Sequence, residues 1–276
     1  TFMNTRELQR QIADTKSTIT DEELFSSKAY QNYLQNIIDN ISEQYGRGAI
    51  IQTKYDTDDN RVAYTDNFRV FVNTANEITL KCTTKTQKNL SCIGLIGHES
   101  GHILFTDFQF ADKYIKALRK GKFFPVKPKK KDFNFKYVKN IDELTDVFSE
   151  ANNAKLRVIE QVAMQFSNIV EDGYVERCMK TKFPGTVAMG IGINNIIQAD
   201  LTPSLQDMVD KDYKPIAIFS NLLLQYVKTG RVENQELVKN EYTDTLFDCL
   251  ADVDMALCEN NSKIRIKKFH RKPAEY

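Results

Sequence analysis

The stretch "GLIGHESGHILFTDF", residues 94–108, holds two of the chain's three histidines, His98 and His102, with Glu99 directly after the first. Residues i and i+4 lie on one face of a helix about one turn apart, so both imidazoles can reach one metal ion. Glu99 lies ~100° around the helix from His98, where it can flank that metal without binding it. The pattern H-E-x-x-H therefore predicts a helix that carries a zinc site and a general base.

The motif also predicts a reaction. Zinc lowers the pKa of its bound water to ~7, and a neighbouring carboxylate can take the proton as the water attacks a carbonyl. A random order of the same residues would give roughly 0.003 such motifs, so chance is a poor explanation. We therefore predict zinc-dependent hydrolysis of peptide bonds with Glu99 as the general base. The alternatives are a histidine pair that only packs, and hydrolysis of another kind of amide.

Two histidines leave the site incomplete, because a catalytic zinc ion generally has three protein ligands and a water. A longer zinc-binding pattern would need a histidine six residues after His102, but Phe108 stands there. The remaining histidine, His270, lies far along the chain in the basic tail "KKFHRKP". These observations favour a carboxylate as the third ligand.

The stretch "SNIVEDGYVERC", residues 167–178, supplies three acids on a second predicted helix, namely Glu171, Asp172 and Glu176. Asp172 and Glu176 share a face at i and i+4, whereas Glu171 points to the neighbouring face, so spacing alone does not choose the ligand. One acid could bind zinc while another orients a histidine. The simpler interpretation of these acids is a solvated polar face of an amphipathic helix.

Composition narrows the function classes further. The 276 residues are 41% hydrophobic and carry a net charge of +1, which gives no support to a nucleic-acid partner. No apolar run approaches the ~20 residues that span a membrane, and the N-terminus lacks the apolar core of a signal peptide. Five scattered cysteines without a CxxC pair indicate free thiols in a reducing compartment. We expect a cytoplasmic protein.

Hydrophobic periodicity predicts an α+β fold that is mostly helical, in a single domain over residues 1–276. Residues 1–47 form a helical lead-in, with Thr20 as an N-cap and Glu23 three residues later. Residues 48–83 form a small sheet of three or four strands. One long helix, with a packed apolar face that continues to Phe108, then carries the histidines. Residues 84–182 are the zinc-site helices with a lysine-rich loop at 119–139, and residues 183–276 are a further helical part.

The motifs "HESGHILFTDF" and "NIVEDGYVE" resemble gluzincin zinc metallopeptidases, and more narrowly the bacterial and phage metallopeptidase domains that often precede a von Willebrand factor A module. The resemblance implies a zincin-like fold with zinc on His98, His102 and Glu171, and with Asp172 as a substitute ligand or as a residue that orients one. It also implies a missing C-terminal module, so that the chain is a fragment of a longer protein.

Such folds hold an extended peptide substrate on the edge strand of the sheet, and residues 61–82 could supply that strand. Tyr174 is a candidate to stabilise the oxyanion, because it lies next to the acidic motif, although core packing would also explain it. The alternative function is a catalytically inactive, zinc-stabilised scaffold or interaction module of a larger protein.

Overall fold

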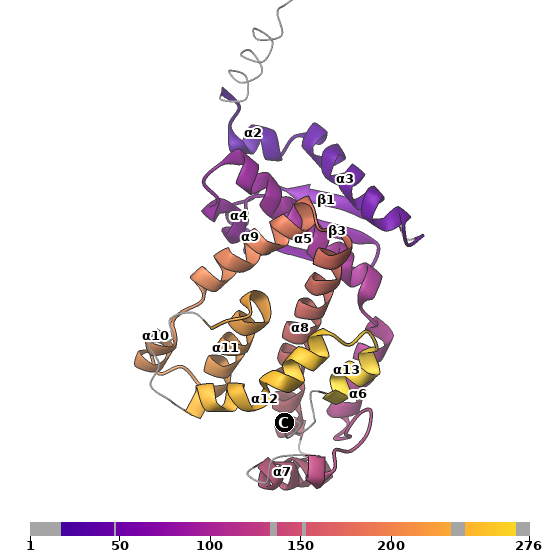
Figure 1. Cartoon of the computed structure of the whole chain (residues 1–276), viewed down its shortest axis with the longest axis vertical. Helices are drawn as coiled ribbons and strands as arrows, with labels where there is room; N and C mark the ends of the chain where they lie inside the picture. The colour runs from indigo at the N-terminus through magenta and orange to yellow at the C-terminus, as the bar shows by residue number, and fades with distance from the viewer. Residues whose placement is uncertain (1–17, 47, 133–136, 151–152, 233–240, 269–276) are drawn as a thin grey trace, which may run out of the picture. The chain divides into compact units, whose positions relative to one another are not determined.

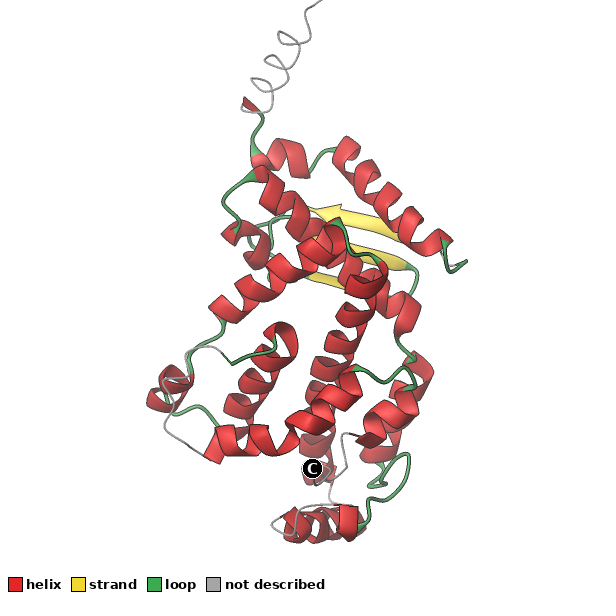
Figure 2. Ribbon diagram, in the orientation of Figure 1, coloured by secondary structure: helices red, strands yellow, loops and turns green. Residues whose placement is uncertain are grey.

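The computed structural model describes residues 18–46, 48–132, 137–150, 153–232 and 241–268. The chain forms two compact units, unit 1 from residues 1–104 and 184–194 and unit 2 from residues 105–183 and 195–276. Helices dominate the described residues, which also contain one small sheet (Figures 1 and 2). The prediction of a mostly helical α+β fold is confirmed. The zincin fold and the single functional domain stay predictions.

The first helices in the described part of unit 1 are α2 (Asp21–Phe25) and α3 (Lys28–Glu43). The predicted N-cap at Thr20 is confirmed, because the Thr20 hydroxyl accepts a hydrogen bond from the Glu23 N–H and the Glu23 carboxylate accepts one from the Thr20 N–H. This reciprocal pair satisfies two backbone groups that would otherwise lack partners at the helix start. Residues 1–17 of the predicted lead-in lie outside the described residues.

The sheet of unit 1 has the strand order β1 (Ile50–Lys54), β3 (Arg69–Asn73), β2 (Ala63–Thr65), with β1 parallel and β2 antiparallel to β3. The predicted sheet is confirmed with three strands. One part of the prediction is wrong, because "EITLK" forms helix α4 (Glu77–Lys81). The Asn76 side chain accepts hydrogen bonds from the Ile78 and Thr79 N–H groups, and this cap outweighs the β-branched composition.

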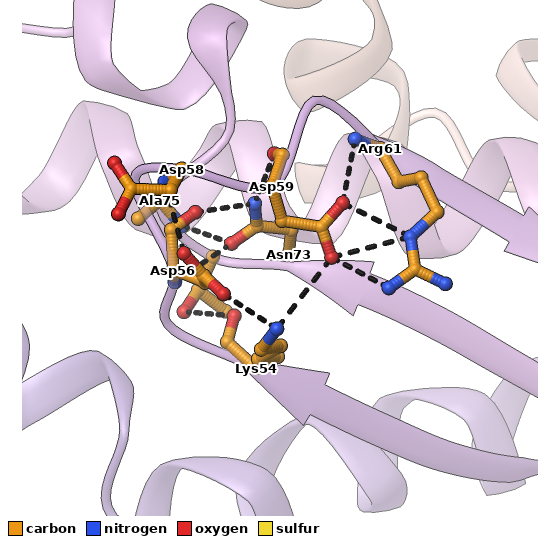
Figure 3. A network of polar contacts seen from close by, with 8 residues as sticks. Lys54, Asp56, Asp58, Asp59, Arg61, Asn73 and Ala75 are labelled. Atoms are coloured by element: carbon orange, nitrogen blue, oxygen red, sulfur yellow. Dashed lines mark hydrogen bonds and ion pairs between the residues drawn. The ribbon is translucent and has the colours of Figure 1, made fainter.

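The loop between β1 and β2 is organised by a network of polar contacts around Asn73 at the end of β3 (Figure 3). The buried Asn73 amide donates to the backbone carbonyls of Asp56 and Asp59, at 2.7 Å and 3.0 Å. Asp56 pairs with Lys54 at 2.5 Å, and Asp59 pairs with Arg61 at 2.6 Å. These cations lower the pKa of both carboxyl groups, so Asp56 and Asp59 are ionised and paired at neutral pH.

Unit 2 consists of helices that are joined by loops: α6 (Phe108–Arg119), η1 (Lys130–Asp132), α7 (Val138–Ser149), α8 (Asn153–Lys182), α10 (Leu205–Asp210), α11 (Pro215–Thr229), α12 (Glu241–Leu257) and α13 (Ser262–Lys268). The remaining helices are α5 (Lys85–Phe105), whose residues 85–104 belong to unit 1, and α9 (Thr186–Leu201), whose residues 186–194 do so. Apolar side chains of α8, α10, α11 and α12 form one core of unit 2, with Met208, Leu222 and Leu223 fully buried.

The long helix predicted from residue 84 onward ends earlier than its hydrophobic spacing indicates. It stops at Phe105, and α6 begins at Phe108, because the Asp107 carboxylate accepts a hydrogen bond from the Phe110 N–H and caps the new helix. The prediction that residues 119–139 form a loop is confirmed apart from the short turn η1, within the residues described there. Residues 133–136 of that loop lie outside the described residues.

The five cysteines are free thiols, as predicted, with Cys82 and Cys92 buried and Cys258 exposed. No helix among the described residues is long and apolar enough to cross a membrane. His270 lies outside the described residues.

Candidate metal centre

Helix α5 carries the H-E-x-x-H motif and is held against the first part of α9 by glycines on both helices. A Cβ atom added to Gly94 would lie 2.2 Å from the backbone carbon of Gly190, and one added to Gly190 would lie 2.2 Å from the Leu90 carbonyl oxygen. Backbone therefore meets backbone at this crossing, which only glycine permits. A Cβ at Gly97 would likewise meet the Val187 side chain. Close packing of α5 against α9 therefore explains both Gly94 and Gly97, although glycine lowers the stability of an isolated helix.

The two histidines of α5 converge on one another. Their Nε2 atoms are 3.2 Å apart, and their ring planes are inclined at 75° with centroids 4.8 Å apart. Two nitrogen ligands at ~2.05 Å from a zinc ion, at the tetrahedral angle, lie about 3.3 Å from each other. The spacing thus fits two ligands of one zinc ion, and it equally fits a hydrogen bond from one imidazole to the other. Both rings are half-buried, so solvent reaches them.

Glu99 follows His98 on the same helix and is 8% exposed. A carboxylate is costly to bury, so the buried Glu99 side chain indicates a specific role in structure or chemistry. Its neighbours on α5 include Ile96 and Ile103, which are core residues.

The acidic motif lies on α8 in unit 2, and there its three acids have different surroundings. Both Glu171 oxygens accept hydrogen bonds from Arg265 of α13, at 3.0 Å from Nε and 3.1 Å from Nη2. Arg265 is 2% exposed and also donates to the Glu259 carbonyl and to the Ser262 hydroxyl. Glu171 is therefore one half of a two-pronged, largely buried ion pair that joins α13 to α8.

Asp172 and Glu176, one turn apart on α8, share a lysine. Lys228, in the last turn of α11, contacts the Glu176 carboxylate directly and lies 3.8 Å from the Asp172 oxygen Oδ2. The Asn195 amide donates to the Glu176 carboxylate at 2.6 Å and to the Lys228 carbonyl at 3.1 Å. It therefore links the two partners of the Glu176–Lys228 ion pair. Glu176 and Lys228 are buried, whereas the Asp172 side chain is 29% exposed.

Tyr174 is enclosed by the helices of unit 2. The Arg265 guanidinium lies 3.7 Å from the centre of its ring, and its hydroxyl donates to the Asn260 side chain at 3.4 Å. Burial raises the pKa of the Tyr174 hydroxyl to about 12, so it stays protonated at neutral pH. These contacts explain the tyrosine as part of the helix packing, and its role toward an oxyanion stays a prediction.

Sequence reasoning missed Arg265, Lys228 and Asn195. Arg265 lies 94 positions from Glu171 and Lys228 lies 52 positions from Glu176, so no local spacing connects them. The one available signal was a lysine in the last turn of an apolar helix that ends in glycine, in "QYVKTG", which helix capping explains equally well.

Comparison with known proteins finds no relative: no protein-family model, no curated protein and no solved structure matches the chain.

Proposed function

We propose that this protein is a zinc-dependent hydrolase of peptide bonds, with His98 and His102 as metal ligands and Glu99 as the general base. The observation that carries the proposal is the 3.2 Å spacing of the two imidazole Nε2 atoms on α5. This separation is close to the ~3.3 Å between two nitrogen ligands of a tetrahedral zinc ion. Glu99 follows the first ligand directly, which is the position of the base in this motif.

For the third ligand we propose Asp172 of the acidic motif, so that one metal ion would be held by His98, His102 and Asp172. The resemblance to gluzincins pointed first to Glu171, and Glu171 remains the alternative. Binding a metal through Glu171 would break its two hydrogen bonds to the buried Arg265, and removing one partner of a buried pair costs ~3–5 kcal/mol. The proposal requires unit 2 to present Asp172 to the two imidazoles.

The same argument disfavours Glu176. Its carboxylate is buried and accepts hydrogen bonds from both Asn195 and Lys228, so metal binding would have to displace two buried hydrogen bonds. Asp172, in contrast, is partly exposed and lies 3.8 Å from Lys228, a distance beyond that of a direct hydrogen bond. It can therefore bind a metal and keep the lysine as its neighbour.

In the proposed reaction each residue of the motif has one task. When bound, zinc supplies a Lewis acid that activates water and polarises the substrate carbonyl. His98 and His102 would hold the ion through their imidazole nitrogens, and both rings are half-buried. Glu99 takes the proton of the attacking water and passes it to the leaving amine.

The sheet of unit 1 offers one edge to an extended peptide. At the β1 edge, Gln35 accepts a hydrogen bond from the Ile51 N–H and donates to the Ala49 carbonyl, so side chains of α3 already use that edge. At β2, the backbone groups of Val62 and Asp66 bond to β3. By the alternation of an antiparallel pair, those of Ala63 and Thr65 point away from the sheet. We propose that a peptide substrate pairs with β2.

The test combines metal content with activity. We expect about one zinc ion per wild-type chain by elemental analysis, loss of zinc in His98→Ala and Asp172→Asn, and retention of zinc in Glu171→Gln. Glu99→Gln should keep its zinc and lose hydrolysis of a broad peptide library. Circular dichroism of each variant serves as the control for folding.

The outcomes distinguish the alternatives. Loss of zinc in Glu171→Gln, with zinc retained in Asp172→Asn, would assign the third ligand to Glu171. A wild-type protein that holds zinc but cleaves no peptide and no other amide would favour a zinc-stabilised scaffold. A wild-type protein that binds no zinc when offered it would overturn the proposal.

A further inference from the structure

Lys228 is a buried cation between two acids of one helix. Its side chain is 6% exposed, and that of its partner Glu176 is 4% exposed. Taking two charges out of water is costly, and a pair of apolar side chains of similar size is often at least as stable in such a place. The contribution of the Glu176–Lys228 pair to folding stability therefore does not by itself explain its burial. Lys228 also lies beside a second acid, Asp172.

Local sequence on both helices brings Lys228 to this position. Gly173, next to Asp172, has no side chain, and a Cβ added there would lie 2.3 Å from Cγ1 of Val227, the residue before Lys228. The glycine therefore allows α11 to approach α8, beside which it packs (Figure 1). Helix α11 ends directly afterwards at Gly230, which has a positive φ of 76° and donates to the Tyr226 carbonyl.

Glu176 and Asn195 then fix the ammonium group. The Asn195 amide donates to the Glu176 carboxylate and to the Lys228 carbonyl, so it holds both the side chain of Glu176 and the backbone of Lys228. Lys180 also approaches Glu176, at 3.7 Å, from a more exposed position. Among the described cations, Lys228 is thus the one whose ion pairs connect Glu176 with Asp172.

We propose that Lys228 is a positioning residue that holds the Asp172 carboxylate in the orientation in which it binds the metal, with Glu176 as the anchor of Lys228. This inference rests on the proposed function, because it takes Asp172 as a ligand. Residues that orient a metal ligand typically change metal affinity by ~10–100-fold when they are mutated. Lys228, at 3.8 Å from Asp172, is placed to restrict that carboxylate without competing for it by a direct hydrogen bond.

The test is the zinc dissociation constant of the full chain, measured by competition with a chromophoric chelator. Lys228→Met keeps the length of the side chain and removes its charge, and we expect the dissociation constant to rise ~10–100-fold. Lys180→Met is the matched control, since it removes the other lysine that pairs with Glu176, and its affinity should equal that of wild type. The absorption spectrum of the cobalt-substituted protein should change in Lys228→Met and not in Lys180→Met.

A double variant separates positioning from mere stability, because Lys228→Met alone removes the buried cation that contacts Glu176 directly. Glu176→Gln combined with Lys228→Met removes both charges and keeps an acceptor for Asn195, so the folding stability lost in the single variant should be recovered. If Lys228 positions Asp172, the double variant still binds zinc ~10–100-fold more weakly than wild type.

Recovery of wild-type affinity in the double variant, or an unchanged affinity in Lys228→Met, would overturn the inference and leave the zinc site itself in place. A wild-type chain that binds no zinc would overturn the proposed function first and the inference with it.

Discussion

Gly190→Ala tests the backbone contact that holds the histidine helix in unit 1. Gly190 lies inside α9, and an added Cβ would be 2.2 Å from the Leu90 carbonyl oxygen and 2.6 Å from the Gly94 backbone nitrogen. Optimal contact between non-bonded heavy atoms lies near ~3.5 Å, so the two helices would have to separate by about 1.3 Å. Because the opposing atoms are backbone, no side-chain rotation can relieve the clash.

Two effects of opposite sign decide the magnitude. Replacing glycine by alanine inside a helix stabilises it by ~1 kcal/mol. Overpacking a close contact destabilises by typically ~1–3 kcal/mol, and backbone displacement belongs at the upper end of that range. We therefore expect Gly190→Ala to lower the free energy of unfolding by about 2 kcal/mol.

Gly192→Ala, two residues further along the same helix, provides the matched control. A Cβ at Gly192 would meet nothing within 4 Å, so only the helix-propensity gain remains and the variant should be more stable than wild type by up to ~1 kcal/mol. Urea denaturation followed by circular dichroism measures the difference between the two variants, for which we expect about 3 kcal/mol. Equal stability of the two variants would refute the contact between α5 and α9.

Two further predictions concern buried groups. Burial raises the pKa of the Cys92 thiol to about 12, above that of the unfolded chain, so its contribution to stability is complete below pH 9 and is lost as pH rises toward 12. At pH 10 the loss from Cys92 is about 1.4 kcal/mol, so between pH 8 and pH 10 wild type should lose about that much more stability than Cys92→Ala in urea denaturation. Arg265→Met removes the cation that pairs with Glu171 and stacks on Tyr174. We expect the free energy of unfolding, measured by thermal denaturation, to fall by about 2–3 kcal/mol. This is less than the ~3–5 kcal/mol of a fully buried pair, because the Glu171 side chain is 21% exposed. Zinc content should stay at the wild-type value in Arg265→Met, and its loss would contradict the assignment of the third ligand to Asp172.

Local signals in the sequence predicted the features that depend on neighbouring residues. The capping pair of Thr20 and Glu23 was correct because both partners lie within one helical turn. The helix that carries His98 and His102 was correct for the same reason, since the i, i+4 spacing and the hydrophobic face belong to one continuous segment. The three strands could be predicted from β-branched runs that are bounded by turn residues.

The two local errors share a cause. Helix α4 was predicted as part of the sheet and the start of α6 as the continuation of α5, and at each place a capping side chain decided the outcome. Asn76 and Asp107 are both residues that favour helix N-termini, and both accept hydrogen bonds from backbone N–H groups two or three positions later. Hydrophobic periodicity contains no information about helix caps. Asn76 and Asp107 were therefore the sequence signals that could have placed the starts of α4 and α6 correctly.

The choice among Glu171, Asp172 and Glu176 is of another kind, because it depends on residues that are remote in sequence. All three acids lie within two turns of α8, and spacing assigns them only to faces of the helix. Arg265 and Lys228 come from helices more than 50 positions away, and their charges make Glu171 and Glu176 costly to remove from their present partners. The third metal ligand should be a carboxylate that can bind the metal ion without taking away the ion-pair partner of a buried arginine or lysine. By that physical criterion Asp172, which is partly exposed and 3.8 Å from its lysine, is the better candidate, although the resemblance to gluzincins implies Glu171.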